Sequence, residues 1–272
     1  MNVTVHQRPG VYSAYDASSV VSGSGAGKQV GLVAVNAKAA ANEVKIVTSY
    51  DGAVNAFGQG TMAELVRLAL KNGAGAVAAV PIAGGEGYAD GFAALEGLED
   101  ITAVICDSTD GDVQKAMKQS VETASANRRE RIAVAAGGAG ETVDQLIARA
   151  KALNHERVVL VAPGGVDQNG EAADGLGVAA AVAGAIAGES DPAVPLGGAV
   201  LTGLYGLSGR CSDGEMDRLI LGGVTPVESL AGTVGVVRGV TTRTTTGEAA
   251  DATWRDLTTI RIVDDVIPTL RR

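Results

Sequence analysis

Histidine, cysteine and aromatic residues are scarce in this chain of 272 residues, which contains two histidines, two cysteines and 3% aromatic residues. The two cysteines, Cys106 and Cys211, lie far apart in the sequence, so they provide neither a disulfide framework nor a zinc-binding set. Cys106 ends an apolar run, which indicates an ordinary buried thiol. This use of cysteine is typical of a protein made in a reducing cytoplasm.

The scarcity of histidine removes the side chain that most often performs acid–base catalysis near neutral pH. His6 lies in a polar N-terminal stretch, and His155 lies in a short loop before an expected strand. Neither histidine has a nucleophile as a neighbour in the sequence. We therefore predict no catalytic residue, no cofactor and no metal site.

Basic residues are also few: the chain has 22 Lys and Arg but 31 Asp and Glu, which gives a net charge of −9. Nucleic acids and anionic membrane surfaces attract proteins with a basic face, so we predict neither as a partner. The longest strongly apolar tract, residues 178–187, is shorter than the roughly 20 residues needed to cross a bilayer. The N-terminal residues show no signal-peptide pattern, and membrane insertion is not expected.

A chain of this length can bury roughly three quarters of the surface that its unfolded form exposes, so a sizeable core is available. Short, almost continuously apolar runs are typical of strands that are buried on both faces of a sheet. Five such runs occur, at residues 30–35, 76–82, 101–106, 132–136 and 158–162.

Helical segments alternate with these runs and are expected at residues 61–72, 112–128, from 142, 176–187 and from 212 to the Gly222-Gly223 pair. A capping box, in which Ser or Thr precedes Glu or Gln by three residues, predicts where a helix begins. Three boxes are expected: Thr61 with Glu64, Thr142 with Gln145, and Ser212 with Glu215. The alternation predicts an α/β fold with a layered, largely parallel sheet flanked by helices.

The first twenty residues read as an extended β arm outside the core. Val3 and Val5 alternate with polar residues, and Arg8-Pro9-Gly10-Val11-Tyr12 then breaks the pattern with a turn signal. A Ser/Gly-rich stretch at 18–27 indicates a flexible joint. Because an isolated strand cannot satisfy its own backbone, we expect Val3, Val5 and residues 8–12 to pair with another subunit.

The C-terminal part is expected to contain further β-structure. Residues 233–240 form a β-like run, and a polar, Thr-rich loop follows at 241–247. Leu257, Ile260 and Ile262 alternate with Thr259 and Arg261, which predicts a half-buried, truncated C-terminal strand.

Three motifs resemble ligand sites without meeting their requirements. Residues 22–29 suggest a phosphate loop, but Ser22 and Gln29 replace its glycine and its magnesium-binding Ser/Thr, and a strand follows where a helix is needed. Residues 107–112 lack the spacing of a calcium loop and are expected to be a loop with a helix N-cap. The charged run at 128–131 is interpreted as a solvated helix end or as a rim contact with a neighbouring subunit.

Several segments together resemble the tail sheath proteins of contractile phage tails and related injection systems. They occur in the family's order along nearly the whole chain: residues 8–12 (RPGVY), Phe57-Gly58 with the helix at 61–72, residues 153–164 (LNHERVVLVAPG), residues 179–198, and residues 222–226 with 236–242 and 254–265. The chain differs in having Gly223-Val224-Thr225 where the family usually has Gly-Val-Asn. Family members also normally continue beyond Arg272, so we expect a fragment or minimal form without the C-terminal domain.

The resemblance implies a linking arm at 1–20, a sheath core at 21–250 and the start of a C-terminal domain at 251–272. It implies a structural subunit, not an enzyme, that polymerises helically around an inner tube and contracts to drive that tube through a target cell envelope. The implied partners are copies of the chain, the tube protein, and baseplate and tail-terminator proteins. The implied location is the virion tail, assembled in the bacterial host cytoplasm.

The residues leave two alternatives open. The first is an α/β enzyme with a nucleotide or small-molecule site. The second is a non-contractile tube or shell subunit. An unpaired arm, a flexible joint and the lack of a catalytic constellation favour a subunit that completes itself on its neighbours, and heterologous contacts of that kind generate open helices.

Overall fold

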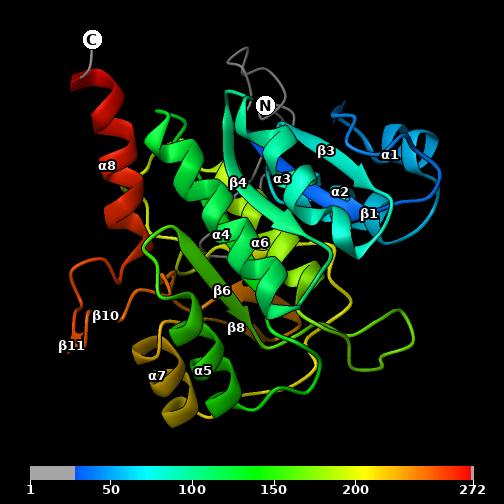
Figure 1. Cartoon of the computed structure of the whole chain (residues 1–272). Coiled ribbons are helices and arrows are strands. Elements are labelled where there is room, and N and C mark those ends of the chain that lie inside the picture. Colours follow the sequence, from blue (N-terminus) through cyan, green and yellow to red (C-terminus); the bar gives the residue numbers. More distant parts are fainter. Residues whose placement is uncertain (1–27, 271–272) are drawn as a thin grey trace, which may run out of the picture.

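A computed structural model describes residues 28–270, and Figure 1 shows their arrangement. The central element is a nine-stranded sheet with the strand order β2-β3-β1-β4-β5-β6-β8-β9-β7. Its strands are β1 (Gln29–Val35), β2 (Lys45–Val47), β3 (Ala76–Ile82), β4 (Ile101–Cys106), β5 (Ile132–Ala136), β6 (Val158–Ala162), β7 (Val200–Leu201), β8 (Thr225–Leu230) and β9 (Thr233–Val236).

The strands from β3 to β8 in this order are parallel, whereas β2 at one edge and β9 and β7 at the other are antiparallel to their neighbours. A separate two-stranded sheet pairs β10 (Thr245–Thr246) with β11 (Ala249–Ala250). The largely parallel α/β sheet predicted from the sequence is confirmed.

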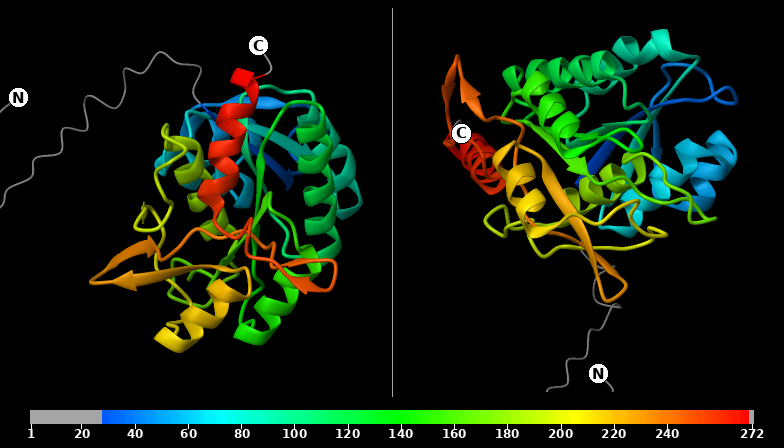
Figure 2. Two further views of the ribbon diagram at one scale, coloured as in Figure 1. Left: turned by 90° about the vertical axis from the view of Figure 1, so that its left-hand side faces the viewer. Right: turned by 90° about the horizontal axis from the view of Figure 1, so that it is seen from below.

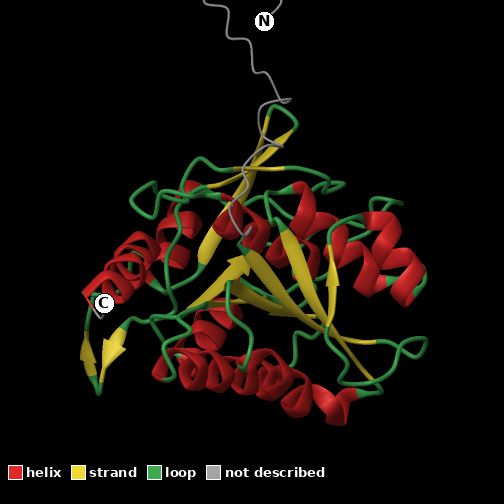
Figure 3. Ribbon diagram, turned by 90° about the horizontal axis from the view of Figure 1, so that it is seen from above, coloured by secondary structure: helices red, strands yellow, loops and turns green. Residues whose placement is uncertain are grey.

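Helices cover both faces of the sheet, as Figure 3 shows. They are α1 (Tyr50–Phe57), α2 (Thr61–Lys71), α3 (Tyr88–Glu96), α4 (Gly111–Ala126), α5 (Val143–Leu153), α6 (Leu176–Gly188), α7 (Asp213–Leu221) and α8 (Leu257–Leu270), with a short 3-10 helix, η2 (Gly85–Gly87), before α3. One buried cluster joins the sheet to α1, α2, α6 and the start of α8. The other joins the opposite face to α3, α4, α5 and α7.

The strands supply both clusters because successive side chains of a strand point to opposite faces. In β3, Val77 and Ala79 belong to the first cluster, whereas Ala78, Val80 and Ile82 belong to the second. All seven residues of β3 are buried. A strand covered on both faces needs apolar residues at every position, which explains why the continuous apolar runs predicted the central strands so well.

Helices α2 and α6 approach each other closely enough to exclude side chains at their contact. A Cβ atom on Gly184 of α6 would lie 2.3 Å from the carbonyl oxygen of Ala69 in α2. A Cβ atom on Gly188 would lie 2.8 Å from the Cα atom of Gly73, whose positive φ of +117° also favours glycine. Glycine is therefore required for this helix pair to pack.

Two of the three predicted capping boxes are confirmed. Thr142 begins α5 with Gln145, and Ser212 begins α7 with Glu215. The box predicted at Thr61 is wrong, because Gly60 is the N-cap of α2 and makes no side-chain bond there. The Glu64 carboxylate instead forms an ion pair with Arg67 one turn later.

The predicted C-terminal strand is also wrong, because Leu257, Ile260 and Ile262 lie in helix α8. Leu257 and Ile260 are buried, and so is Arg261, which gives the helical spacing of three and four residues. β-branched residues made the segment resemble a strand. The β-like run at 233–240 is a strand only over Thr233–Val236.

Candidate assembly surfaces

Two terminal segments were predicted to link subunits, and the structure describes only the second. The arm residues Val3, Val5, Arg8, Pro9, Gly10, Val11 and Tyr12 lie outside the described residues. The second segment is not a dangling strand but helix α8, which packs on the core. Leu257 and Ile260 are 1% and 4% exposed and belong to the same buried cluster as the sheet, whereas Ile262 is 39% exposed.

An ion pair fixes α8 to the amino end of β6. The Arg157 guanidinium donates two hydrogen bonds, of 2.7 and 2.8 Å, to the two carboxylate oxygens of Asp264. Both side chains are largely buried, and this burial raises the pKa of the Asp264 carboxyl although Arg157 acts to lower it. A two-pronged arginine–carboxylate pair fixes orientation as well as distance, so it holds α8 in one position.

A second arginine, Arg261 of α8 itself, attaches the same face of the helix one turn earlier. Arg261 is buried, and its guanidinium donates to the backbone carbonyls of Glu189 and Val194, beyond the end of α6. Burial lowers the pKa of Arg261. Arg157 and Arg261 therefore attach α8 at two points, and Figure 2 shows the helix lying along the side of the body.

His155 is part of the structural framework next to this attachment. Its Nε2 atom lies 3.0 Å from a carboxylate oxygen of Glu122 in α4. Its Nδ1 atom accepts a hydrogen bond from the backbone N–H of Arg157, at 3.0 Å. Burial lowers the pKa of this imidazole. With both ring nitrogens engaged by neighbouring elements, His155 holds the amino end of β6 against α4.

Within the charged run at 128–131, Arg128 is exposed as expected for a solvated helix end, whereas Arg131 is not. Arg131 is 1% exposed, and its guanidinium donates to the carbonyls of Leu95 and Leu98 at the end of α3. Burial lowers its pKa to about 10. Sequence reasoning missed the buried roles of Arg131, Arg157 and Arg261, since a charged residue ordinarily indicates surface; only the helical spacing in α8 offered a signal for Arg261.

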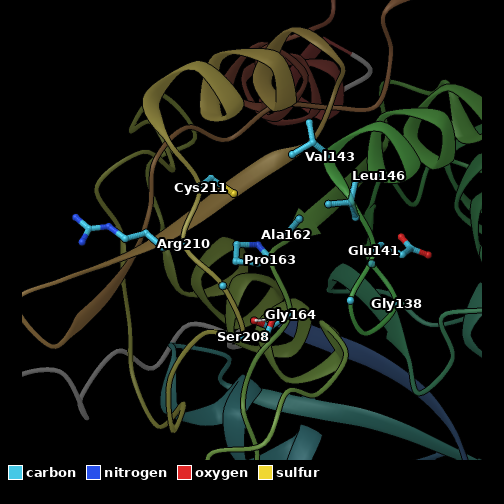
Figure 4. A pocket seen from close by; sticks show the side chains of 13 residues that line it. Gly138, Glu141, Val143, Leu146, Ala162, Pro163, Gly164, Ser208, Arg210 and Cys211 are labelled. Carbon is cyan, nitrogen blue, oxygen red and sulfur yellow. Dashed lines mark hydrogen bonds between the residues drawn. The ribbon is translucent and has the colours of Figure 1, made fainter.

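A cavity of about 180 Å³ lies beside the carboxyl ends of β5 and β6, where an α/β enzyme would hold its ligand. In Figure 4, Cys211 lies on one side of this cavity and Glu141 on the other, with Pro163 between them. Burial raises the pKa of the Cys211 thiol, so the sulfur is not activated as a thiolate. Glu141 is engaged in an ion pair with Arg149. These residues do not form a nucleophile–base pair.

The described part of the chain holds no group of three or more His, Cys, Asp or Glu residues placed to bind a metal ion. Within residues 28–270, every helix is too short or too polar to cross a lipid bilayer. Cys106 is buried, as predicted, and burial raises its pKa to about 12. The arrangement is that of a structural α/β domain with a firmly attached C-terminal helix.

Comparison with known protein families shows which family this domain belongs to. The model of the phage tail sheath protein central domain matches residues 82–242, and the chain belongs to that family. Membership in this family gives the chain a structural role in a tail sheath and not an enzymatic one, as the sequence resemblance implied. None of the curated proteins matches the chain.

Solved structures share the fold. A sheath tail protein from Desulfitobacterium hafniense has a TM-score of 0.74 at 13% identity, over 97% of this chain and 82% of its own. One from Listeria innocua has a TM-score of 0.70 at 14% identity, over 90% and 75%. The helical sheath of the anti-feeding prophage, solved in its contracted state, has a TM-score of 0.67 at 19% identity, over 97% and 74%.

Proposed function

We propose that this subunit polymerises with copies of itself into a helical sleeve around an inner tube, and that contraction of the sleeve drives the tube through a target cell envelope. The match of the sheath family model to residues 82–242 carries this proposal. Structures with the same fold include a helical sheath in a contracted state and a baseplate of the anti-feeding prophage. The proposed partners are accordingly copies of the chain, an inner tube protein, and baseplate and tail-terminator proteins.

The attachment of α8 supports a mechanism in which rigid bodies move. Arg157 of the core binds Asp264 of this helix, and Arg261 of the helix binds the segment beyond α6. Leu257 and Ile260 are buried with the sheet. A sleeve that contracts must repack whole subunits without unfolding them, so its moving units have to be rigid. We place the linkage between these units in the arm at 1–20, with the joint at 18–27 allowing the cores to rotate.

The division of the chain follows from the same proposal. Residues 1–20 are the linking arm, 21–250 the sheath core and 251–272 the start of the C-terminal sheath domain. The energy for contraction is stored when the sleeve assembles, so no nucleotide is required. The sleeve belongs to a phage tail or injection system, and we propose that it assembles in the cytoplasm of the bacterial host.

Deleting residues 2–12 from the chain tests the role of the arm. The deletion should leave thermal unfolding within about 3 °C, because residues outside the core contribute few buried contacts. It should abolish sleeves in electron micrographs of the concentrated protein. Sleeves of normal length without the arm would show that the linkage lies elsewhere.

A matched pair of double variants separates a specific strand contact from a general effect of charge. Val3→Lys with Val5→Lys should act like the deletion, because each charge would enter the apolar face of the acceptor sheet. Thr4→Lys with His6→Lys adds the same residues to the opposite face of the predicted strand and should leave sleeves intact. Equal effects of the two pairs would contradict the proposed strand pairing.

A further inference from the structure

The longest stretch of the sequence without a charged residue runs from Pro192 to Gly209. Most of this stretch lies at the surface, where charged residues are normally most frequent. Val194 is 40% exposed and Val200 is 56% exposed. Uncharged and apolar surface of this extent is typical of a contact with another protein.

The same stretch contains β7, which forms one edge of the nine-stranded sheet. An edge strand presents unpaired backbone groups, and proteins normally protect such an edge with a charge, a proline or a bulge. The opposite edge, β2, has this protection, because Lys45 lies in the strand and Glu43 just before it. Strand β7 carries no charge, and no charged residue lies within eight residues of it along the sequence. In space, the Arg67 guanidinium of α2 donates to the Gly203 carbonyl, two residues after the strand.

Neighbouring elements extend this surface around β7 without adding net charge. Leu230, at the end of β8, is 55% exposed, and the β8–β9 hairpin projects from the body in Figure 2. A groove near β7 is lined by Pro195, Leu196 and Gly197 and by the start of α8. Arg238 and Asp256 also line it, and their ion pair leaves the groove without net charge. Together, β7, the loop before it, the hairpin tip and the groove form a continuous face, which we call the β7 face.

We infer that the β7 face is a contact between copies of this chain in the sheath. Each copy carries a net charge of −9, so copies repel one another except where they meet through uncharged surface. A basic partner would instead be drawn to the acidic segment between Lys71 and Lys115, which has eight carboxylates and no Lys or Arg. The neutral β7 face therefore fits a second copy better than an oppositely charged protein.

The contact is heterologous, meaning that the β7 face of one copy meets a different face of the next. A helical sleeve requires contacts of this type, whereas a face that pairs with itself closes a dimer. The inference thus rests on the proposed function and adds to it a named surface in the core. It is independent of the N-terminal arm, which lies outside the described residues.

Two lysine substitutions at opposite edges of the same sheet test the inference. Val200→Lys places a charge on the β7 edge, and Ile46→Lys places one on the β2 edge, where Ile46 is 53% exposed and β-branched like Val200. The exposure of both sites means that both variants should fold, which thermal unfolding checks. We expect Val200→Lys to raise the protein concentration needed for sleeves by at least about tenfold, and Ile46→Lys to leave it unchanged.

Sedimentation of polymer at a series of protein concentrations, with electron microscopy of the pellet, measures the effect. Normal assembly of Val200→Lys, or equal losses in both variants, would overturn the inference. So would a closed dimer that Val200→Lys dissociates, because that result indicates a self-paired face. If arm deletion abolishes sleeves while Val200→Lys does not, the proposed function stands and the β7 face is not a contact. If the unaltered chain forms no sleeves at any concentration, the proposed function itself fails.

Discussion

Removing the Asp264 carboxylate should detach helix α8 from the core. Arg157 and Asp264 form a two-pronged pair whose side chains are only 11% and 17% exposed. Breaking a buried pair by deleting one partner costs about 3–5 kcal/mol, because the other charge is left unpaired. Since both groups keep some contact with water, we expect Asp264→Ala to lower the free energy of unfolding by about 3 kcal/mol, the low end of that range.

Denaturant unfolding measures this loss, and hydrogen exchange shows where it occurs. The amides of α8 should exchange faster in Asp264→Ala, whereas those of the central strands should follow global unfolding. Asp265→Ala is the matched control, because Asp265 is the next residue of the helix and is exposed. We expect that control to change stability by no more than about 0.5 kcal/mol.

A double replacement tests the reasoning about the unpaired charge. Arg157→Met combined with Asp264→Leu removes both charges and should restore stability to within about 1 kcal/mol of the original chain. A loss in Asp264→Ala no larger than in Asp265→Ala would refute the claim that the pair attaches α8. A double variant as unstable as the single one would show that the cost arises from lost packing and not from the orphaned Arg157.

Three further predictions concern the core, its pH dependence and its thiols. Gly184→Ala should destabilise the protein by about 1–3 kcal/mol in denaturant unfolding, since its Cβ atom would lie 2.3 Å from the Ala69 carbonyl oxygen. Hydrogen bonds from neighbouring threonines lower the pKa of Asp251 from 3.8 to about 2. The ionised carboxylate therefore stabilises the fold above about pH 4, and this stabilisation is lost as the pH falls towards 2. Asp251→Asn should remove that part of the pH dependence of the free energy of unfolding. A thiol reagent should modify the partly exposed Cys211 in the folded protein and Cys106 only after unfolding, because Cys106 is buried with a pKa of about 12.

The sequence predicted the central strands because burial on both faces demands an unbroken apolar run. The runs at 76–82, 101–106, 132–136 and 158–162 coincide with β3, β4, β5 and β6. The edge strands β2 and β7 escaped prediction because they are only three and two residues long and are partly exposed. Such short strands form because they pair with a neighbouring strand, and they are too short to show a hydrophobic pattern in the sequence.

Helix α8 was misread because its inward face carries charges. Leu257, Ile260, Arg261 and Asp264 follow the spacing of one helical face, but only two of them are apolar. Whether an arginine is buried depends on an acceptor that is distant in the sequence, as with Arg157 and Asp264. The sheath family resemblance did not depend on this assignment, since it rests on the order of several motifs along the chain.

Electron microscopy of the concentrated, unaltered chain tests the central claim, that this subunit builds a helical sheath, most directly. The account predicts sleeves whose averaged images or diffraction show one helical lattice with a single repeating subunit. In dilute solution the chain should elute near its monomer mass of 27.2 kDa, because each contact alone is small. Flat sheets, closed rings or a monomer that persists at every concentration would contradict the claim.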